Sequence, residues 1–519
     1  MINAAVLEQK VQELEAQLQE KEALLQSRAD RIQTLEELIK QFNRKQFSAS
    51  SEKLSKDQLD LGLFNEAEST EDGKESEQAQ AGEPENDETV KVPAHTRRKK
   101  PRVSIPAHIP REEVLYELPE SERVCPHDGT ELKAIGTEDH EQLDIIPAQA
   151  KVILHRRQKY VCPCCEQHHV TADKPKQPIE KSIASPGLLA YVATQKYCDA
   201  LPLYRQSEIF KRVGLAIERT NLANWMIRSG ELVQPLINLL HEQLLEQPVI
   251  HLDETTVQVL NEPGKTAHSQ SYMWVMGSFS ASPAVLFHYA DSRRQAVPLE
   301  LLDESVGAVM VDGYEGYEKA CQHYQITRLG CWAHARRKLV DAKALQKKGK
   351  TGKADQGLAY IQRLYALEKV IKDHPPDERY RRRQLEAKSV IDELRAWLEK
   401  SLPQVPPQSA IGKALQYLHT QWHRLVRYLD DGAYPIDNNP AENAIRPFTV
   451  GRKNWLFANS QAGAKASANL YSLIESAKVN KLNPYDYLKL VFKELPNAQS
   501  VEAIEKLLPW NINVNPELV

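Results

Sequence analysis

Apolar side chains recur every seven residues through the first 45 positions of the chain. No Gly or Pro interrupts this run, and Glu, Gln and Lys fill most of the remaining positions. A heptad repeat of this length predicts a coiled coil over residues 1–47, in which the apolar seam pairs with a second helix. A single helix packed on the body of the protein is the alternative. The a positions are Ala4, Val11, Leu18, Leu25, Ile32 and Ile39, and the d positions are Leu7, Leu14, Lys21, Arg28, Leu35 and Phe42.

The pattern changes at residue 48, and residues 48–102 have the composition of an acidic disordered linker. Between Asn65 and Glu88 there are ten acidic residues against one Lys, with no aromatic side chain. Such a segment cannot bury enough apolar surface to fold. It ends in a basic cluster, which is either a solvated tether or an arm that contacts phosphates. The cluster consists of Arg97, Arg98, Lys99, Lys100 and Arg102.

Short β-like stretches and several cysteines fill residues 103–180, which predicts a small β-rich module. Residues 181–246 have a helical pattern instead. Within them, 203–212 and 218–228 form two predicted helices around a turn at 213–216 that contains Gly214, as in a helix–turn–helix.

Residues 247–335 contain five strand-like runs rich in β-branched and aromatic side chains: VIHLDET, YMWVMGSFS, AVLFHYA, AVMVDG and ITRLGCW. Helices are predicted at 293–302 and 314–323, between the third and fourth and the fourth and fifth runs. Strands that alternate with helices in this way predict an α/β core. Residues 336–435 are almost purely helical and predict an insertion. The core resumes over 436–480, where VGRKNWLFAN is expected to be a strand or hairpin, and a helical tail covers 481–519.

Composition excludes several classes of protein. There is no run of about 18 apolar residues that would predict a membrane span, and the N-terminus lacks the pattern of a secretory signal. Seven cysteines do not form a disulfide framework. Residues 1–88 hold 10 Lys/Arg against 21 Asp/Glu, a net charge of −11, so the rest of the chain carries a net +7. We therefore expect a cytoplasmic protein whose mildly basic body is compatible with nucleic acid.

Three carboxylates carry the candidate chemistry. Asp253 and Asp312 end two predicted strands, in HLDET and VMVDGYEGY, and Glu442 follows Pro440 in the first turn of a predicted helix. Two carboxylates on neighbouring strands and one on a helix can hold two divalent ions about 3.5–4 Å apart, as in-line phosphoryl transfer requires. Oxygen ligands favour Mg²⁺ or Mn²⁺. Helix caps or surface charges are the alternative interpretation of each residue taken alone.

Long strings in the chain resemble the large transposase of insertion-sequence family sixty-six, the TnpC-type protein with a DDE catalytic domain. The resemblance covers nearly the whole chain and is weakest in the acidic linker. It implies a ribonuclease-H-like catalytic core with a helical insertion, and it matches Asp253, Asp312 and Glu442 to the DDE positions. The matching strings are QFNRKQFSASSEKL, EQLDIIPAQ, PIEKSIASPGLLAYVATQKYCDALPLYRQ, HLDET, VDGYEGY, GCWAHARRK, DNNPAENAIRPFTVGRKNWLFANS, YSLIESAKVNKLNPYDYL and LLPW.

The cysteine module contains one CxxC pair, Cys162 and Cys165, which lies 37 residues after Cys125. Four ligands of this kind would satisfy tetrahedral Zn²⁺. The first knuckle is degenerate, because Asp128 stands where a second Cys would fall, so His127 is the candidate fourth ligand, with His168 or His169 as alternatives. The resemblance implies a zinc-finger-like module here. Reduced structural cysteines are the alternative.

Basic side chains near the carboxylates are candidate DNA contacts. Cys331 and His334 form a CxxH that resembles a signature of several DDE lineages, although a structural pair is the commoner interpretation. Arg336 and Arg337 follow on the same predicted helix and can donate to phosphates. After Glu442 the candidates are Arg446, Arg452 and Lys453, with Trp455 either stacked on an unpaired base or packed in the core.

These features predict a DNA transposase that binds the terminal inverted repeats of an insertion sequence and, with Mg²⁺ or Mn²⁺, cleaves and transfers DNA strands. Its expected partners are terminal-repeat and target DNA, a second copy through the coiled coil, and small accessory proteins of the same element. We expect it at the bacterial nucleoid. The alternatives are a two-metal endonuclease on the same fold and a DNA-binding protein with a decayed catalytic site.

Overall fold

The structure is a computed structural model, which describes residues 4–47, 115, 127, 149–161, 169–280, 282–346 and 351–512. Residues 73–156 form a unit separate from the rest of the chain. The predicted linker over 48–102 lies outside the described residues, as does Cys125. Among the described residues, no helix is both long and apolar enough to cross a bilayer.

Residues Ala4–Phe47 form one helix, α1, of 44 residues. The helix itself was predicted by the heptad repeat. The apolar seam side chains that the structure describes are strongly exposed and form a stripe along the helix, which the charged Lys21 and Arg28 interrupt. Their exposed fractions are 59% for Leu14, 60% for Leu18, 65% for Leu25, 59% for Ile32, 50% for Leu35 and 60% for Ile39.

Two short antiparallel strands, β1 (Lys159–Val161) and β2 (His169–Thr171), precede and follow the segment that contains the predicted zinc ligands Cys162 and Cys165. Tyr160 lies opposite Val170 in their register. Cys162 and Cys165 fall between the two strands, at 162–168, outside the described residues.

Four helices follow, as the pattern over 181–246 predicts: α3 (Pro186–Tyr197), α4 (Leu203–Arg212), α5 (Arg219–Leu232) and α6 (Gln234–Leu245). The turn between α4 and α5 contains Gly214 at φ +82°, a backbone conformation that favours glycine. Helix α5 lies very close to α15 (Gln461–Val479), because a Cβ at Gly230 would stand 2.5 Å from the Cα of Ala466. The absence of a side chain at Gly230 therefore allows α5 to pack this closely against α15.

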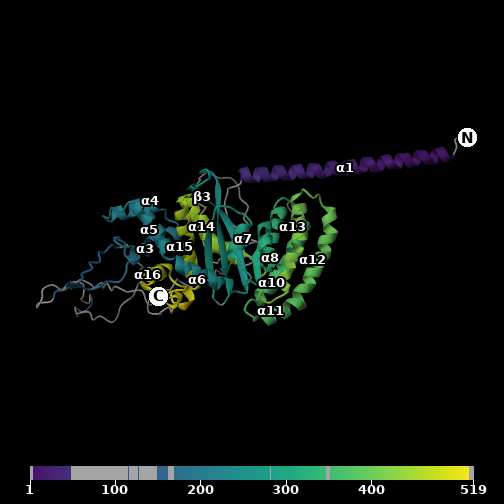
Figure 1. Cartoon of the computed structure of the whole chain (residues 1–519). Helices are drawn as coiled ribbons and strands as arrows, with labels where there is room; N and C mark the ends of the chain where they lie inside the picture. Colours follow the sequence, from purple (N-terminus) through teal and green to yellow (C-terminus); the bar gives the residue numbers. More distant parts are fainter. Residues whose placement is uncertain are drawn as a thin grey trace. The chain divides into compact units, whose positions relative to one another are not determined.

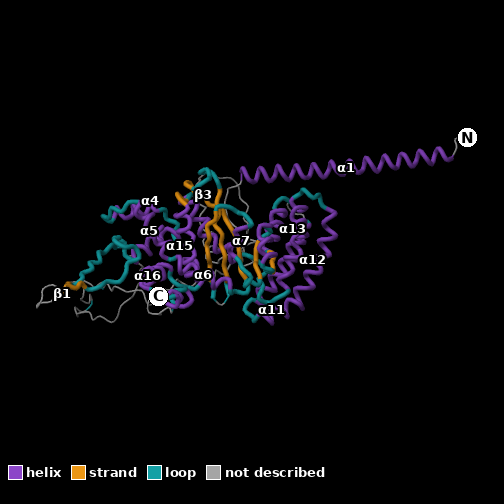
Figure 2. The backbone as a smooth tube through the Cα atoms, viewed as in Figure 1, coloured by secondary structure: helices purple, strands orange, loops and turns teal. Residues whose placement is uncertain are grey.

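The five predicted strands form one mixed sheet in the order β5-β4-β3-β6-β7. The strands β3, β4 and β5 are antiparallel neighbours, whereas β6 and β7 run parallel to β3. Figure 2 shows these strands between two groups of helices. The strand bounds are Val249–Asn261 for β3, Gln270–Ser278 for β4, Ala284–Ala290 for β5, Ala308–Val311 for β6 and Thr327–Gly330 for β7, and the connecting helices are α7 (Ala296–Leu301), η3 (Glu315–Tyr317) and α8 (Glu318–His323).

The edge strand β5 is covered by α15. The hydroxyl of Ser476 accepts a hydrogen bond from the Val285 amide and donates to the Val285 carbonyl, each at 2.9 Å. The hydroxyl of Ser472 accepts from the Phe287 amide at 2.7 Å. An uncovered edge strand offers its unpaired amides and carbonyls to other chains. These two serines occupy such groups with side chains of the same protein.

The predicted insertion is helical and has a hydrophobic cluster of its own. Trp332, Leu394 and Leu418 are fully buried members of this cluster. Figure 1 shows its helices on the β7 side of the sheet, opposite α3, α5, α15 and α16. The elements are α9 (Trp332–Lys343), α10 (Lys353–Ile371), α11 (Pro376–Arg382), the π-helical η4 (Arg383–Ala387), α12 (Lys388–Ser401), η5 (Leu402–Gln404), α13 (Ala410–Leu425) and η6 (Val426–Leu429).

The chain returns to the sheet in α14 (Asn439–Trp455), which packs against β3 and β4. The expectation of a strand or hairpin at VGRKNWLFAN is wrong for most of its length, because the helix continues to Trp455. It ends at Leu456, which has φ +64°, and only β8 (Ala458–Ser460) is a strand, parallel to β3. The tail is helical, as predicted, with α16 (Pro484–Glu494), η7 (Leu495–Asn497), α17 (Val501–Glu505) and η8 (Pro509–Asn511).

Candidate catalytic site

Asp253 and Asp312 come from neighbouring parallel strands. The register of β3 and β6 pairs Ile250 with Val309 and His251 with Met310. Continuing it by two residues sets Asp253 opposite Asp312, which follows the last residue of β6. Asp312 directly follows the end of β6, but β3 continues to Asn261, so the expectation that Asp253 ends its strand is wrong. The parallel register still sets the two aspartates opposite each other. Both side chains are partly exposed.

Glu442 approaches the same two aspartates from α14. It lies in the first turn of this helix, two residues after Pro440. One carboxylate oxygen, Oε2, accepts a hydrogen bond from the Arg337 guanidinium of α9 at 2.6 Å. The other, Oε1, is buried and accepts no hydrogen bond. Glu442 therefore has one paired oxygen and one oxygen without a donor.

Negative charge is concentrated around Asp253. Burial raises the pKa of Asp253 well above its usual value, and the nearby carboxylates of Glu254, Glu442 and Asp312 raise it further. Carboxylates that raise one another's pKa in this way indicate a place for a cation. The carboxylates of Asp253, Asp312 and Glu442 are therefore close enough to influence one another electrostatically.

Two residues near the carboxylates were not singled out in the sequence. Glu254 is almost fully buried and accepts hydrogen bonds from the Tyr317 hydroxyl and from Arg293. The Arg293 guanidinium also lies 3.9 Å from the Asp312 carboxylate and 3.7 Å from the centre of the Tyr314 ring. Arg293 thus joins the Glu254 and Asp312 carboxylates. Only the acidic doublet in HLDET hinted at this arrangement.

Asn438 fixes the start of α14 against β3. Its side chain donates to the Leu252 carbonyl at 2.8 Å and accepts from Nδ1 of His251 at 3.0 Å. Burial lowers the pKa of His251 to about 4, so the ring is neutral and can donate from this nitrogen. Asn438 itself is fully buried. No local sequence pattern indicated this bond between Asn438 and the strand that carries Asp253.

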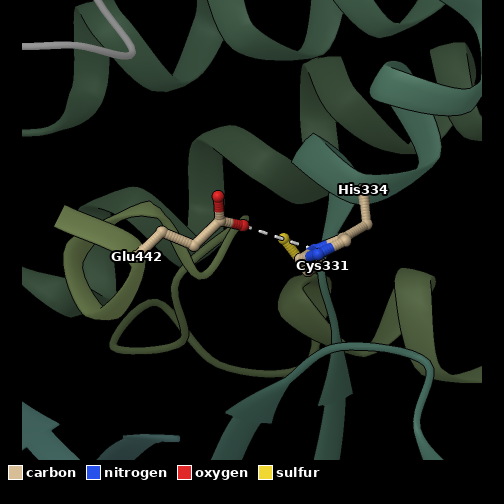
Figure 3. Close-up of side chains that lie close together, drawn as sticks. All are labelled: Cys331, His334 and Glu442. Atoms are coloured by element: carbon tan, nitrogen blue, oxygen red, sulfur yellow. Dashed lines mark ion pairs between the residues drawn. The ribbon is translucent and has the colours of Figure 1, made fainter. Parts of the chain in front are cut away.

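A second group of ligand-type side chains includes Glu442. The Cys331 sulfur, a His334 ring nitrogen and a Glu442 carboxylate oxygen all lie within 4.8 Å of one another. Figure 3 shows these three side chains converging from α14 and from the start of α9. In the part of the chain that the structure describes, no group formed by Asp253, Asp312 and Glu442 meets this separation. Glu442 is thus shared between the predicted trio and a closer, sulfur-containing group.

The predicted DNA contacts differ in exposure. Arg336 is buried, whereas the side chain of Arg337 is 42% exposed. Lys453 is exposed and Arg446 partly so. Arg452 donates to the hydroxyls of Thr255 and Thr256 on β3, at 3.2 and 3.1 Å.

Trp455 is half-buried at the end of α14. Its ring centre lies 5.3 Å from that of Phe448, and the Lys196 ammonium stands 5.1 Å from the Trp455 ring. His127 is exposed, and its predicted zinc partners lie outside the described residues.

Comparison with known protein families shows to which family the chain belongs. The model described as "Transposase IS66 family" matches residues 181–466, which include every strand of the mixed sheet, the insertion and the three carboxylates. The chain belongs to this family. Three further models match the flanking segments: "Transposase C of IS166 homeodomain" at 34–114, "zinc-finger binding domain of transposase IS66" at 122–166 and "IS66 C-terminal element" at 472–510.

Relatives of similar length occur in Sinorhizobium fredii. Uncharacterized protein y4qI is 31% identical over 495 residues, which cover 93% of this chain and 89% of the relative. Uncharacterized protein y4jD is 32% identical over 422 residues, 78% of this chain and 81% of the relative. Membership of the IS66 family supports a DNA transposase, and the zinc-finger match supports a zinc site within 122–166.

Proposed function

We propose that this IS66-family chain cleaves the ends of its own element and joins them to target DNA through a DDE site made of Asp253, Asp312 and Glu442. The observation that carries the proposal is the proximity of three carboxylates: the register of β3 and β6 sets Asp253 opposite Asp312, and Glu442 in the first turn of α14 lies close enough to raise the pKa of Asp253. A mixed sheet with three antiparallel strands followed by two parallel ones is compatible with the ribonuclease-H-like core that the resemblance implies.

The three carboxylates are the proposed ligands of two Mg²⁺ or Mn²⁺ ions. When bound, such ions activate the attacking hydroxyl and stabilise the leaving oxygen of an in-line displacement. The chain's own contribution is positioning. Asn438 holds the start of α14 against β3, and Arg337 holds one oxygen of Glu442. Arg293 restrains Asp312 from the other side.

Positive charge beside the trio is the proposed path of the DNA backbone. Arg337, Arg446 and Lys453 lie on α9 and α14, the two helices that meet at Glu442, and have exposed or partly exposed side chains. Guanidinium and ammonium groups bind phosphate by charge-assisted hydrogen bonds. The assignments of Arg336, Arg452 and Trp455 as DNA contacts stay predictions.

We further propose that α4 and α5 read the element's ends as a helix–turn–helix, with α5 in the major groove. The exposed face of α5 carries side chains that pair with base edges, because Asn binds adenine and Arg binds guanine. These exposed residues are Arg219, Thr220, Asn221, Asn224 and Arg228.

Replacing Asn224 or Arg228 by Ala is expected to weaken binding to end-sequence duplexes by about 1–3 kcal/mol each, and to weaken binding to scrambled duplexes less. The two side chains are four residues apart and share one face of the helix. Fluorescence anisotropy with both duplexes measures the difference. Glu231→Gln, on the exposed surface of the same helix, is the matched control. Equal losses on end and scrambled DNA would assign both residues to the backbone instead.

Pairing of α1 with a second copy is the proposed use of its exposed apolar stripe. Leu18→Asp with Leu25→Asp is expected to convert the full-length chain to monomers, because two charges would enter the seam. Light scattering coupled to size exclusion measures the mass. Ala16→Asp with Ala23→Asp adds the same charge at exposed positions outside the seam. A seam variant that keeps the wild-type mass would show that α1 does not hold the copies together.

The zinc-finger-like module is proposed to hold Zn²⁺ through Cys125, His127, Cys162 and Cys165 and to help bind DNA. Small accessory proteins of the same element stay predicted partners.

Strand cleavage on labelled duplexes that carry the element's ends, with Mg²⁺ or Mn²⁺, tests the central proposal. Metal-dependent nicking at the ends followed by joining to a second duplex is the expected result. Nicking without joining would favour the two-metal endonuclease. Binding without any metal-dependent turnover would favour a DNA-binding protein with a decayed site.

A further inference from the structure

One group of side chains offers three different ligand atoms, unlike a site made only of carboxylates. It consists of Cys331, His334 and Glu442, which offer sulfur, nitrogen and oxygen. Cys331 follows β7 and caps the start of α9, and His334 lies in the first turn of that helix. The ligand atoms of the three side chains lie within 4.8 Å of one another. Two helix starts, α9 and α14, therefore bring sulfur, nitrogen and oxygen to one point, which Figure 3 shows.

The distances approach those of a tetrahedral metal site. Zn–S bonds of about 2.3 Å and Zn–N and Zn–O bonds of about 2.0–2.2 Å place neighbouring ligand atoms roughly 3.3–3.6 Å apart in a tetrahedron. The Nδ1 atom of His334 and the Oε1 atom of Glu442 are 3.6 Å apart. The Cys331 sulfur lies within 4.8 Å of a ligand atom of each of these two side chains.

The two atoms that face each other lack hydrogen bonds. Nδ1 of His334 and Oε1 of Glu442 are both buried, and neither has a hydrogen-bond partner. Their separation is too long for a hydrogen bond between them. Buried polar atoms in proteins are normally satisfied, so such a pair marks a place for a missing partner such as an ion.

The surroundings also suit a bound cation. The Cys331 sulfur accepts a hydrogen bond from the Asn438 amide at 3.2 Å. Burial raises the pKa of the free thiol, so the metal ion itself must displace the proton. Arg337 pairs with the other oxygen of Glu442, as outer partners of a ligating carboxylate do.

We propose that Cys331, His334 and Glu442 bind one Zn²⁺-class transition-metal ion, distinct from the Mg²⁺ or Mn²⁺ pair. Thiolate and imidazole select such ions over Mg²⁺, which requires oxygen ligands. On binding, the Cys331 sulfur loses its proton to solvent and forms the metal–sulfur bond. Three protein ligands leave one position for a water.

This site has a consequence that rests on the proposed catalytic function. Glu442 cannot direct Oε1 both to the sulfur site and to the carboxylate pair on β3 and β6. Zn²⁺ is therefore an inhibitor that holds Glu442 away from Asp253 and Asp312. Sequence spacing alone did not indicate this competition, because 108 residues separate His334 from Glu442.

Cobalt titration of the metal-free, full-length chain tests the site, because Co²⁺ bound to a thiolate gives a charge-transfer band. The background variant carries Ser in place of Cys125, Cys162, Cys164 and Cys165, which removes the sulfur of the zinc-finger-like module. We expect this background to bind one Co²⁺ per chain with a thiolate band. Zn²⁺ should displace the Co²⁺, and Mg²⁺ at the same concentration should not.

Three further substitutions, each made in the background variant, test which side chains bind the Co²⁺. Cys331→Ser should abolish the band, and His334→Gln, at a partly exposed position, should weaken Co²⁺ binding at least tenfold. Cys321→Ser, at a buried cysteine outside the group, should leave the band intact. Circular dichroism checks that each variant is folded. A background without the band, or a band that survives Cys331→Ser, would overturn the site.

Cleavage assays then separate the metal site from the proposed function. The Zn²⁺ concentration that halves Mg²⁺-dependent cleavage should rise at least tenfold in Cys331→Ser relative to the wild type. Unchanged inhibition would overturn the competition. A cobalt–thiolate band in a chain that never cleaves DNA would support the metal site and reject the catalytic proposal, whereas cleavage without the band would do the opposite.

Discussion

Glu442→Gln is expected to lower Mg²⁺-dependent cleavage of end duplexes by at least about 10³-fold while DNA binding stays nearly unchanged. The change removes one of three carboxylates around the proposed metal pair and alters no other side chain. Metal ions contribute several kcal/mol of transition-state stabilisation, and each 1.36 kcal/mol is a tenfold change in rate. Single-turnover cleavage of a labelled strand measures the effect.

Two controls distinguish a loss of catalysis at Glu442 from a loss of folding or a general effect of a Glu-to-Gln change. Gln is close to Glu in size, and only the ion pair with Arg337 is lost at this position, so the unfolding midpoint should change little. Glu304→Gln, the same chemical change at an exposed position far along the chain, should leave the cleavage rate as it is. Wild-type cleavage by Glu442→Gln would remove Glu442 from the catalytic site.

Arg383→Met is expected to destabilise the helical insertion by about 3–5 kcal/mol. Arg383 is fully buried and pairs with both oxygens of Glu368, at 2.8 and 2.7 Å. It also donates to the carbonyls of Tyr428 and Asp431, each at 2.8 Å. Met fills similar space but leaves a buried carboxylate and two carbonyls without donors. Chemical unfolding followed by circular dichroism, which reports on the helices, measures the loss.

A nearby arginine and a double variant provide the controls. Arg381 is exposed and pairs with Glu378 one turn away, so Arg381→Met should not change stability measurably. Adding Glu368→Met to Arg383→Met removes the uncompensated charge and should recover part of the lost stability. A double variant less stable than Arg383→Met alone would show that the buried charge is not the cause.

The order and position of the strands could be predicted from the sequence because β-branched and aromatic runs alternate with helical ones. Asp312 could be placed at the end of its strand for the same reason, whereas β3 continues beyond Asp253 to Asn261. Pro440 indicated where α14 begins, and Glu442 followed from it. These are local signals, and the structure adds the parallel register that sets Asp253 opposite Asp312.

The other features of the fold and the site depend on contacts between residues far apart in the sequence, and local patterns could not predict them. Gly451 and Asn454 are weak helix formers. Helix α14 nevertheless continues to Trp455, because it buries Phe448 against Phe287 of β5 and Gly451 against Tyr471 of α15, and this packing overrides local preference. The bonds from Asn438 to His251 and Leu252 join segments 186 or more residues apart. No spacing rule relates such residues, so neither Asn438 nor the Cys331–His334–Glu442 group could be assembled from the sequence.

During synthesis of the chain, β5 is translated well before α15, the helix that covers its outer edge. The hydrogen bonds from Ser476 to Val285 span 191 residues, and ribosomes add about 5–20 residues per second. The outer edge of β5 therefore stays uncovered for roughly 10–40 seconds after it has been translated. During that interval the growing polypeptide is most open to strand pairing with its neighbours on a polysome, and a transcript that stops before α15 would yield a product that keeps this edge permanently.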